Sequence, residues 1–254
     1  MAGLALAAGT VSGVAVLAGQ VIAARSRSYA KPELGLGLRT TIGPAGAPPL
    51  RLVLLGDSAA LGVGADHSAD TVGGQLARLL SEGVAGAPAR QVYLSSVGVS
   101  GSRSADLATQ VARALLAGRP DVAVIMIGAN DVTALRRPGE SAAYAASAVR
   151  RLRDAGVEVV VGTCPDLGAV RSLARPLRQI TGWMGRRTAQ AQTWAVRDAG
   201  GRVVDLAAET GPVFRADAGT LSDDGYHPSA DGYRVWAHAL LPAVAAAAAV
   251  TQRR

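Results

Sequence analysis

Short apolar runs alternate with longer amphipathic stretches from residue 50 to the end of the chain, and this alternation limits the possible folds more than any other feature. Each run is leucine-rich or β-branched and is bounded by Gly, Asp or Pro, as expected of strands buried on both faces. The runs are Leu50–Leu55, Val92–Val97, Val122–Ile127, Val157–Gly162 and Arg202–Leu206. The stretches between and after them predict helices near 70–82, 104–117, 140–155, 172–199 and 229–249. We therefore expect right-handed βαβ units in an α/β fold, a three-layer α/β/α sandwich with a five-stranded parallel sheet.

The N-terminal residues 3–24 form an uncharged apolar run, and three basic residues follow it at Arg25, Arg27 and Lys31. The run is about long enough to cross a bilayer as a helix, which predicts a membrane anchor. A cleaved signal peptide, and hence a secreted or cell-envelope protein, is one alternative; a helix packed on the domain is another. The basic residues would keep the domain cytoplasmic by the positive-inside rule, whereas a signal would export it, so the side of the membrane stays open. Residues 25–49 are rich in proline and glycine and predict an irregular linker before a domain at 50–250.

The composition is that of a chain with a real core, since 49% of the residues are hydrophobic and 18% are charged. The formal net charge is +7, and arginine carries nearly all of the positive charge because Lys31 is the only lysine. The arginines are scattered and form no dense basic run. This pattern favours a solvated surface that interacts with acidic lipid or cell-surface polymers, and it argues against a nucleic-acid partner. The single cysteine, Cys164, follows a predicted strand and is expected to be an inert buried thiol. We expect no metal and no organic cofactor, because the sequence has no Cys/His cluster or phosphate-binding glycine loop.

A serine lies directly after the first predicted strand, in the sequence Gly56-Asp57-Ser58. Its hydroxyl would lie at the carboxyl edge of the sheet, where ligands bind in parallel α/β folds. The start of a helix favours negative charge, so the Ser58 N–H could also stabilise an oxyanion. The alternative is a turn in which Asp57 or Ser58 only caps the helix, and the tripeptide alone does not decide between the two.

The next two predicted strands also end in hydrogen-bond donors. The second runs into a loop that contains Gly98 and Gly101, and glycine there lets a backbone N–H approach a ligand closely. The third is followed by Asn130, whose side chain can offer an N–H to an oxyanion without adding charge. Turn geometry explains the glycines equally well, and an Asx turn is the alternative for the asparagine. Three successive strand ends with donors at one edge favour a functional role for Asn130.

An aspartate and a histidine lie three residues apart before the last predicted helix, at Asp224 and His227. Asp224 can accept a hydrogen bond from His227 Nδ1, which fixes the tautomer and leaves Nε2 to take a proton from a serine hydroxyl. A serine is a poor nucleophile until such a base lies within reach. A helix cap and a surface histidine are the alternative interpretation. His67, in a polar loop, and His238, on the outer face of the last helix, are poorer candidates for the base.

The four motifs just described form four sequence blocks, at Ser58, at the loop with Gly98 and Gly101, at Asn130, and at Asp224 with His227. In this order the blocks resemble the GDSL/SGNH hydrolase superfamily over about residues 50–242, and the Ala/Arg-rich composition resembles its actinobacterial lipases and esterases. The resemblance implies the flavodoxin-like SGNH fold, which agrees with the sandwich expected from the alternation. It also implies a triad in which Ser58 is the nucleophile, Asp224 the orienting acid and His227 the base.

The resemblance implies an oxyanion hole formed by the Ser58 N–H, the Gly101 N–H and the Asn130 side chain. Gly98 competes with Gly101 for the second block. Where the family has an asparagine before that block, this chain has Ser95 or Ser96.

The implied activity is hydrolysis of carboxylic esters through an acyl-enzyme intermediate on Ser58. We expect a small-molecule or lipid ester of short to medium acyl chain as substrate, with acetylated glycans as the second choice. A segment after the fourth strand could line an acyl groove with Leu167, Leu173, Leu177, Ile180 and Trp183. Core packing is the favoured alternative for its helical part, because four residues there are spaced as one helix face: Ile180, Trp183, Arg187 and Trp194.

Two other functions stay open at this point. An acyltransferase, or a deacetylase acting on an acylated glycan or lipid, would use the same acyl-enzyme. A membrane-tethered binding module is the non-enzymatic alternative, and the complete set of candidate site residues argues against it. We expect a monomer that associates with a membrane through residues 3–24.

Overall fold

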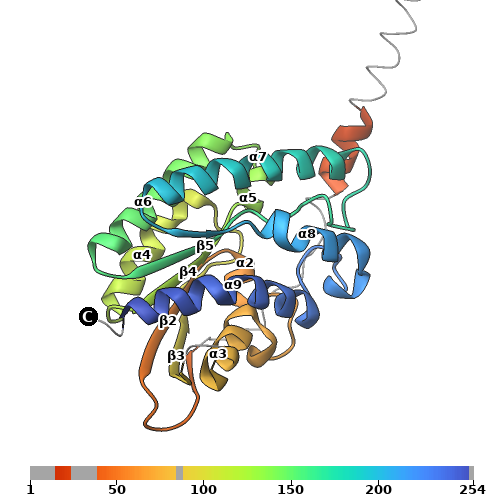
Figure 1. Cartoon of the computed structure of the whole chain (residues 1–254). Coiled ribbons are helices and arrows are strands. Elements are labelled where there is room, and N and C mark those ends of the chain that lie inside the picture. Colours follow the sequence, from red (N-terminus) through yellow and green to blue (C-terminus); the bar gives the residue numbers. More distant parts are fainter. Residues whose placement is uncertain (1–14, 24–38, 84–87, 252–254) are drawn as a thin grey trace, which may run out of the picture.

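The computed structural model describes residues 15–23, 39–83 and 88–251, and its centre is a six-stranded sheet in the order β1-β3-β2-β4-β5-β6. Helices cover both faces of the sheet (Figure 1). Five strands are parallel, and they match the five predicted runs to within two residues at each end: β2 (Pro49–Gly56), β3 (Gln91–Ser96), β4 (Val122–Met126), β5 (Glu158–Gly162) and β6 (Arg202–Val204). The α/β/α sandwich is therefore confirmed.

The first strand, β1 (Arg39–Ile42), corrects two predictions. It pairs antiparallel with β3, so the sheet has six strands and is mixed rather than five-stranded and purely parallel. It also lies inside the predicted linker 25–49, of which residues 25–38 are outside the described residues. The strand has no apolar alternation because it lies at an edge with mostly exposed side chains, and such strands leave little trace in a sequence.

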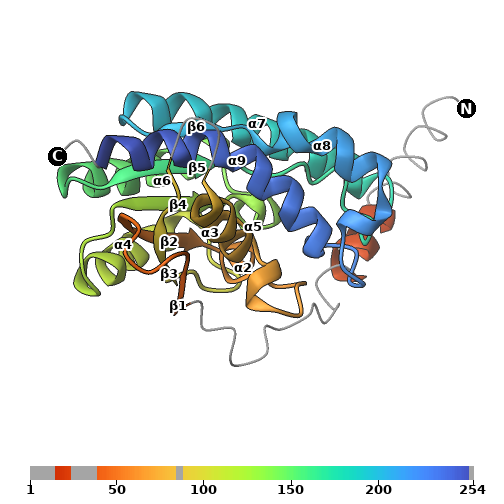
Figure 2. The ribbon, with the colours of Figure 1, turned by 60° about the horizontal axis from the view of Figure 1, so that its bottom comes forward.

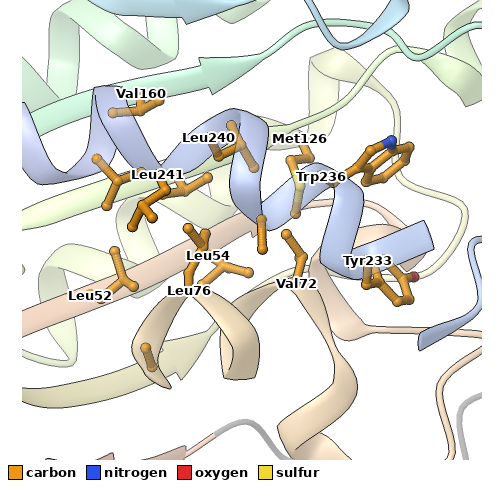
Figure 3. Close-up of a cluster of buried hydrophobic side chains, with 14 of the residues drawn as sticks. Leu52, Leu54, Val72, Leu76, Met126, Val160, Tyr233, Trp236, Leu240 and Leu241 are labelled. Carbon is orange, nitrogen blue, oxygen red and sulfur yellow. The ribbon is translucent and has the colours of Figure 1, made fainter. Parts of the chain in front are cut away.

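Alternate residues of the strands point into two cores on opposite faces of the sheet. On one face Leu52 and Leu54 of β2 pack against α3 (Val72–Glu82) and α9 (Ala230–Thr251), as Figure 3 shows. On the other face Val53 and Leu55 pack against three helices: α4 (Leu107–Leu116), α6 (Pro138–Asp154) and α7 (Leu177–Asp198). Figure 1 shows α9 and α3 on one side of the strands and α6 and α7 on the other, and Figure 2 brings the side with α3 and α9 forward. The double burial explains why these strands are almost wholly apolar.

Most helix predictions hold, with three differences. α7 begins at Leu177 rather than 172, because an irregular segment precedes Pro176. The end of the run predicted as a fifth strand belongs instead to α8 (Leu206–Ala216), which contains Pro212 and so gave a weak helical signal. The short helix α2 (Ser58–Leu61) begins where a helix start was expected, whereas the short helix α5 (Ala129–Thr133) was not predicted.

Among the described residues, the helix long and apolar enough to cross a membrane is the C-terminal α9, whereas the sequence pointed to an N-terminal helix. α9 packs on the sheet, and its side chains Tyr233, Leu240 and Val244 are fully buried in the core. Of the apolar run 3–24, residues 15–23 are helical and the rest lies outside the described residues. The membrane-anchor prediction therefore stays a prediction.

Three large apolar side chains on α7 are not packed in the core, contrary to the favoured interpretation. Ile180, Trp183 and Trp194 are exposed, so they do not pack in the core. Leu167 and Leu173, in the segment before α7, are buried together with Val132 of α5 in a third, smaller cluster. The aromatic residues of α7 thus face outward, which the periodicity alone did not predict.

Candidate active site

The structure brings Ser58, His227 and Asp224 into one hydrogen-bonded chain. Ser58 Oγ lies 3.0 Å from His227 Nε2, and His227 Nδ1 lies 2.6 Å from Asp224 Oδ2. Ser58 and His227 are both buried. A hydroxyl, an imidazole and a carboxylate in this order have the geometry in which the imidazole can take the hydroxyl proton while the carboxylate fixes its tautomer.

Asp224 is held by a tight turn of its own neighbours. Its Oδ1 accepts hydrogen bonds from the Tyr226 N–H at 2.7 Å, the His227 N–H at 2.8 Å and the Ser222 hydroxyl at 3.0 Å. Burial alone would raise the pKa of this carboxyl, but the hydrogen bonds from His227 and Tyr226 outweigh it and lower the pKa below its ordinary value. Asp224 is therefore an anion at neutral and at mildly acidic pH.

Ser58 lies at the β2–α2 junction, whose backbone conformation requires glycine at the end of the strand. Gly56 has a φ of +136°, and a Cβ there would lie 1.8 Å from the Met126 carbonyl oxygen of β4. The buried Gln110 of α4 accepts from the Gly56 N–H at 2.7 Å and donates to the Gly56 carbonyl at 2.8 Å. These contacts fix the strand end from which the chain enters α2.

Asp57 caps this short helix, as the alternative interpretation of the motif proposed. The cap does not exclude a role for Ser58, whose hydroxyl contacts His227. Asp57 Oδ1 accepts from the Ala59 N–H at 3.0 Å. Burial raises the pKa of Asp57 to about 6, although the Ala59 N–H and the interaction with His227 both act to lower it. Asp57 is thus a buried carboxyl next to the serine, and its charge state changes in the mildly acidic range.

The turn that carries His227 reaches Ser58 because the loop after α2 presents no side chain to it. A Cβ on Gly64, whose φ is +98°, would lie 2.4 Å from the Pro228 carbonyl oxygen and 3.1 Å from His227 Cβ. The buried Tyr233 of α9 donates to the Val63 carbonyl at 2.7 Å and holds the same loop from below. Glycine and tyrosine together let two segments far apart in the chain approach each other.

Asn130 lies at the start of α5, at the same edge of the sheet. Its Nδ2 donates to the Ser102 carbonyl at 3.1 Å and lies 3.5 Å from Asp57 Oδ2. Asp131, next to it, accepts from the N–H and hydroxyl of Ser104, each at 3.0 Å through Oδ2, and so joins the second and third blocks. The Asn130 amide is therefore oriented by the loop of the second block.

The glycines of the second block, Gly98 and Gly101, do not line the cavity beside Ser58 in the described part of the chain, whereas Asn130 does. Gly101 has a φ of +79° and an exposed position, and the Gly98 N–H donates to Ser96 Oγ at 3.2 Å. The role of Gly101 as an N–H donor stays a prediction.

A mostly apolar cavity opens beside Ser58 and His227. Its volume is about 60 Å³. Its apolar wall comes from several elements and includes Met126, Pro165, Leu167, Leu206, Phe214 and Trp236. Phe214 and Trp236 contact each other with ring centroids 5.8 Å apart. The hydroxyl thus faces a small hydrophobic space.

Cys164 is buried, as predicted, and its thiol has a pKa raised well above the ordinary value, first by burial and then by nearby carboxylates. In the described part of the chain, no group of three or more His, Cys, Asp or Glu side chains is arranged to hold a metal ion. His67 and His238 are exposed and lie outside the cavity lining.

The supporting residues were not found from the sequence. Gln110 forms hydrogen bonds with the backbone of Gly56. Gln192 of α7 does the same at two other strand ends, since it accepts from the Cys164 N–H at 2.8 Å and donates to the Ile127 carbonyl at 3.0 Å. Both glutamines are buried in helices that look amphipathic. A glutamine on the apolar face of a helix is the one signal that could have pointed to them.

A family model described as the GDSL-like lipase/acylhydrolase family matches residues 54–235. The chain belongs to this family. The match includes every element that bears the hydrogen-bonded chain of Ser58, His227 and Asp224.

Relatives of this GDSL-like chain include proteins named as esterases. The GDSL-like esterase Rv1075c of Mycobacterium tuberculosis is 44% identical over 197 residues, which cover 77% of this chain and 62% of that relative. The chain thus spans less than two thirds of the length of this relative.

Solved structures agree on the fold. The acetylxylan esterase Axe2 of Geobacillus stearothermophilus superposes with a TM-score of 0.56 at 21% identity, over 78% of this chain and 95% of that one. A putative SGNH hydrolase from Slackia heliotrinireducens gives a TM-score of 0.56 at 24% identity, over 77% and 99% of the two chains. These likenesses support the α/β fold of the family.

Proposed function

We propose that this chain is a serine esterase that hydrolyses short-chain acyl esters through an acyl-enzyme on Ser58. The observation that carries the proposal is the chain of contacts from Ser58 Oγ to His227 at 3.0 Å and from His227 to Asp224 at 2.6 Å, next to an apolar cavity. The family and its esterase relatives point to the same chemistry.

The reaction has two steps. Ser58 Oγ attacks the ester carbonyl while His227 Nε2 takes its proton, and His227 then gives that proton to the leaving alcohol. Water next attacks the acyl-enzyme with His227 again as base, which releases the acid and restores Ser58. Asp224 stays ionised throughout and stabilises the imidazolium, in agreement with its lowered pKa.

Asn130 and the Ser58 N–H are proposed to stabilise the tetrahedral oxyanion. Ser58 is the first residue of α2, and the first N–H groups of a helix have no partner within it. Asn130 Nδ2 exchanges its bond to the Ser102 carbonyl, at 3.1 Å, for one to the oxyanion as negative charge develops. Gly101 is proposed as a third donor by its family motif alone.

The size of the cavity favours a short acyl group. A cavity needs roughly 10–15 Å³ to hold one ordered water. The cavity of about 60 Å³ beside Ser58 therefore has room for only a few waters or a short acyl chain. The wall of leucine, phenylalanine and tryptophan suits an acetyl to butyryl chain and disfavours a charged acid. We therefore place acetate and butyrate esters before longer ones.

The test is release of p-nitrophenol from acetate, butyrate and octanoate esters by the wild type, by Ser58→Ala and by Ser147→Ala. Ser147 lies exposed on α6 and serves as the matched control. We expect Ser58→Ala to lose activity by more than about a thousandfold while Ser147→Ala equals the wild type. Acetate and butyrate esters should react faster than octanoate.

Equal activity of wild type and Ser58→Ala would overturn the proposal. Faster reaction of octanoate would overturn the short-chain assignment alone. Adding an acceptor alcohol shows whether the acyl group passes to it instead of water, which would make the chain an acyltransferase with the same Ser58 chemistry.

A further inference from the structure

Five arginines surround a second cleft next to the Ser58 cavity. The cleft has a volume of about 490 Å³ and runs along the segment before α7, the first half of α7 and the end of α8. The arginines that line it are Arg171, Arg175, Arg178, Arg186 and Arg215. In the sequence these arginines are spread over residues 171–215. They lie together in the structure because the end of α8 contacts the segment before α7, where the Arg171 side chain donates to the Arg215 carbonyl.

Few negative charges balance these arginines. The buried carboxylate of Asp166 lies behind the cleft, 2.5 Å from Arg215 and 3.9 Å from Arg186. Within the described parts of the chain, Arg171, Arg175 and Arg178 form no ion pair. Two arginines are therefore neutralised in part by one acid, and three present their charge to solvent. A surface with this excess attracts anions.

The cleft and the Ser58 cavity share a wall. Ala169 lines both, and Asp166, which holds Arg215, lines the cavity. The N–H groups of Arg171 and Ser172 donate to the Gly225 carbonyl at 2.9 and 3.0 Å, so the arginine loop is bonded to the turn of Asp224 and His227. An anion in the cleft therefore lies next to the wall that the cleft shares with the Ser58 cavity.

Exposed apolar groups flank the same cleft. Residues 15–23 form a helix against the start of α7, where Gln20 donates to the Arg175 carbonyl at 2.7 Å and accepts from the Leu177 N–H at 3.2 Å (Figure 1). Ile22 on this helix is 68% exposed, and Trp183 on α7 is 56% exposed beneath the guanidinium of Arg187. Arginine beside exposed tryptophan and isoleucine is the composition of a membrane interface. A soluble phosphate would need the arginines but not these apolar neighbours.

We propose that the arginine cleft, together with the helix 15–23 and Trp183, is a docking face for anionic lipid headgroups. The guanidinium groups bind the phosphates, and the apolar side chains enter the boundary between headgroups and acyl chains. Docking in this way turns the opening of the Ser58 cavity towards the bilayer, a consequence that rests on the proposed esterase function, whereas the lipid binding itself does not.

The test is co-flotation of the full chain with vesicles of phosphatidylcholine alone or mixed with phosphatidylglycerol. The triple variant Arg171→Gln, Arg175→Gln, Arg178→Gln is compared with a control of equal charge change: Arg113→Gln, Arg150→Gln and Arg197→Gln. The control residues are exposed, and Arg197 lies at the other end of α7. Each arginine at an anionic surface contributes about fivefold to the partition coefficient, so the triple variant should lose about a hundredfold of the preference for phosphatidylglycerol.

The control variant should keep that preference, and added salt should weaken it in the wild type. Equal preference in the triple variant and the control would overturn the proposal. So would loss of the wild-type preference in the presence of millimolar inorganic phosphate at constant ionic strength, because that result assigns the cleft to a free phosphate. Hydrolysis of soluble p-nitrophenyl acetate should be unchanged in the triple variant, and Ser58→Ala should still bind vesicles, so failure of this proposal and failure of the esterase proposal are distinguishable.

Discussion

The two halves of the candidate site are held in place by different means. The four hydrogen bonds to the Asp224 carboxylate all come from residues within three positions, so the acid and base are set by one turn. Ser58 depends on distant parts of the chain instead, since its strand end is held by Gln110, which is 54 positions from Gly56. A local half can be recognised in a sequence, whereas the other half exists only once the sheet and its helices have formed.

The largest expected effect comes from breaking the local half. Asp224→Asn keeps the shape of the side chain but replaces an acceptor by a donor, so His227 adopts the wrong tautomer for taking a proton from Ser58. We expect kcat on p-nitrophenyl acetate to fall by about 10⁴. Asp223→Asn, at the exposed neighbouring position, is the control and should leave kcat unchanged. A loss below tenfold in Asp224→Asn would separate the turn from catalysis.

Asn130→Ala tests the distant half at the point where it would meet the oxyanion. Loss of one donor should lower kcat by about 10²–10³ with little change in KM, since the donor acts on the transition state. Thr133→Ala on the same short helix is the matched control, and its hydroxyl only donates to the Asn130 carbonyl at 3.3 Å. Steady-state kinetics decide the case. A rise in KM at constant kcat would make Asn130 a group for ground-state binding instead.

Gln110→Ala tests how the distant half is held. Removal of this side chain takes away the hydrogen bond that the buried Gly56 N–H donates to Gln110, while the Gly56 carbonyl keeps the one from the Val99 N–H at 3.1 Å. We expect the free energy of unfolding to fall by about 2–4 kcal/mol, measured by urea denaturation. Gln190→Ala, exposed on α7, should change it very little. Equal stability of the two variants would show that Gly56 does not need Gln110.

Asp57→Asn gives the smallest effect and one that depends on pH. The pKa of Asp57 is about 6 in the folded chain against 3.8 ordinarily, so the folded chain binds more protons between these values and its stability falls as the pH rises through them. The asparagine variant lacks this fall. It should therefore exceed the wild type at pH 8 by up to roughly 3 kcal/mol and equal it near pH 4.

Thermal unfolding of Asp57→Asn across that pH range is the measurement, with the exposed Asp66→Asn as control. A stability difference that does not change between pH 4 and pH 8 would contradict a raised pKa at Asp57.

The same contrast explains what could be predicted from the sequence. The five parallel strands were predictable because each contains a short apolar run bounded by Gly, Asp or Pro, and each candidate residue follows such a run or lies in a tight turn. β1 was not, because it is short and exposed, and α8 was not, because Pro212 interrupts its helical pattern. Gln110 and the arginine cleft have partners far along the chain, so only the folded structure brings them together.

The most direct test of the central claim is covalent. A p-nitrophenyl alkylphosphonate reacts with a serine only where a neighbouring base removes its proton, and it leaves a stable adduct that peptide mass mapping can locate. We expect one adduct, on Ser58, formed at a rate that falls sharply in His227→Ala. An adduct on another residue, or labelling of Ser58 at the same rate without His227, would contradict it.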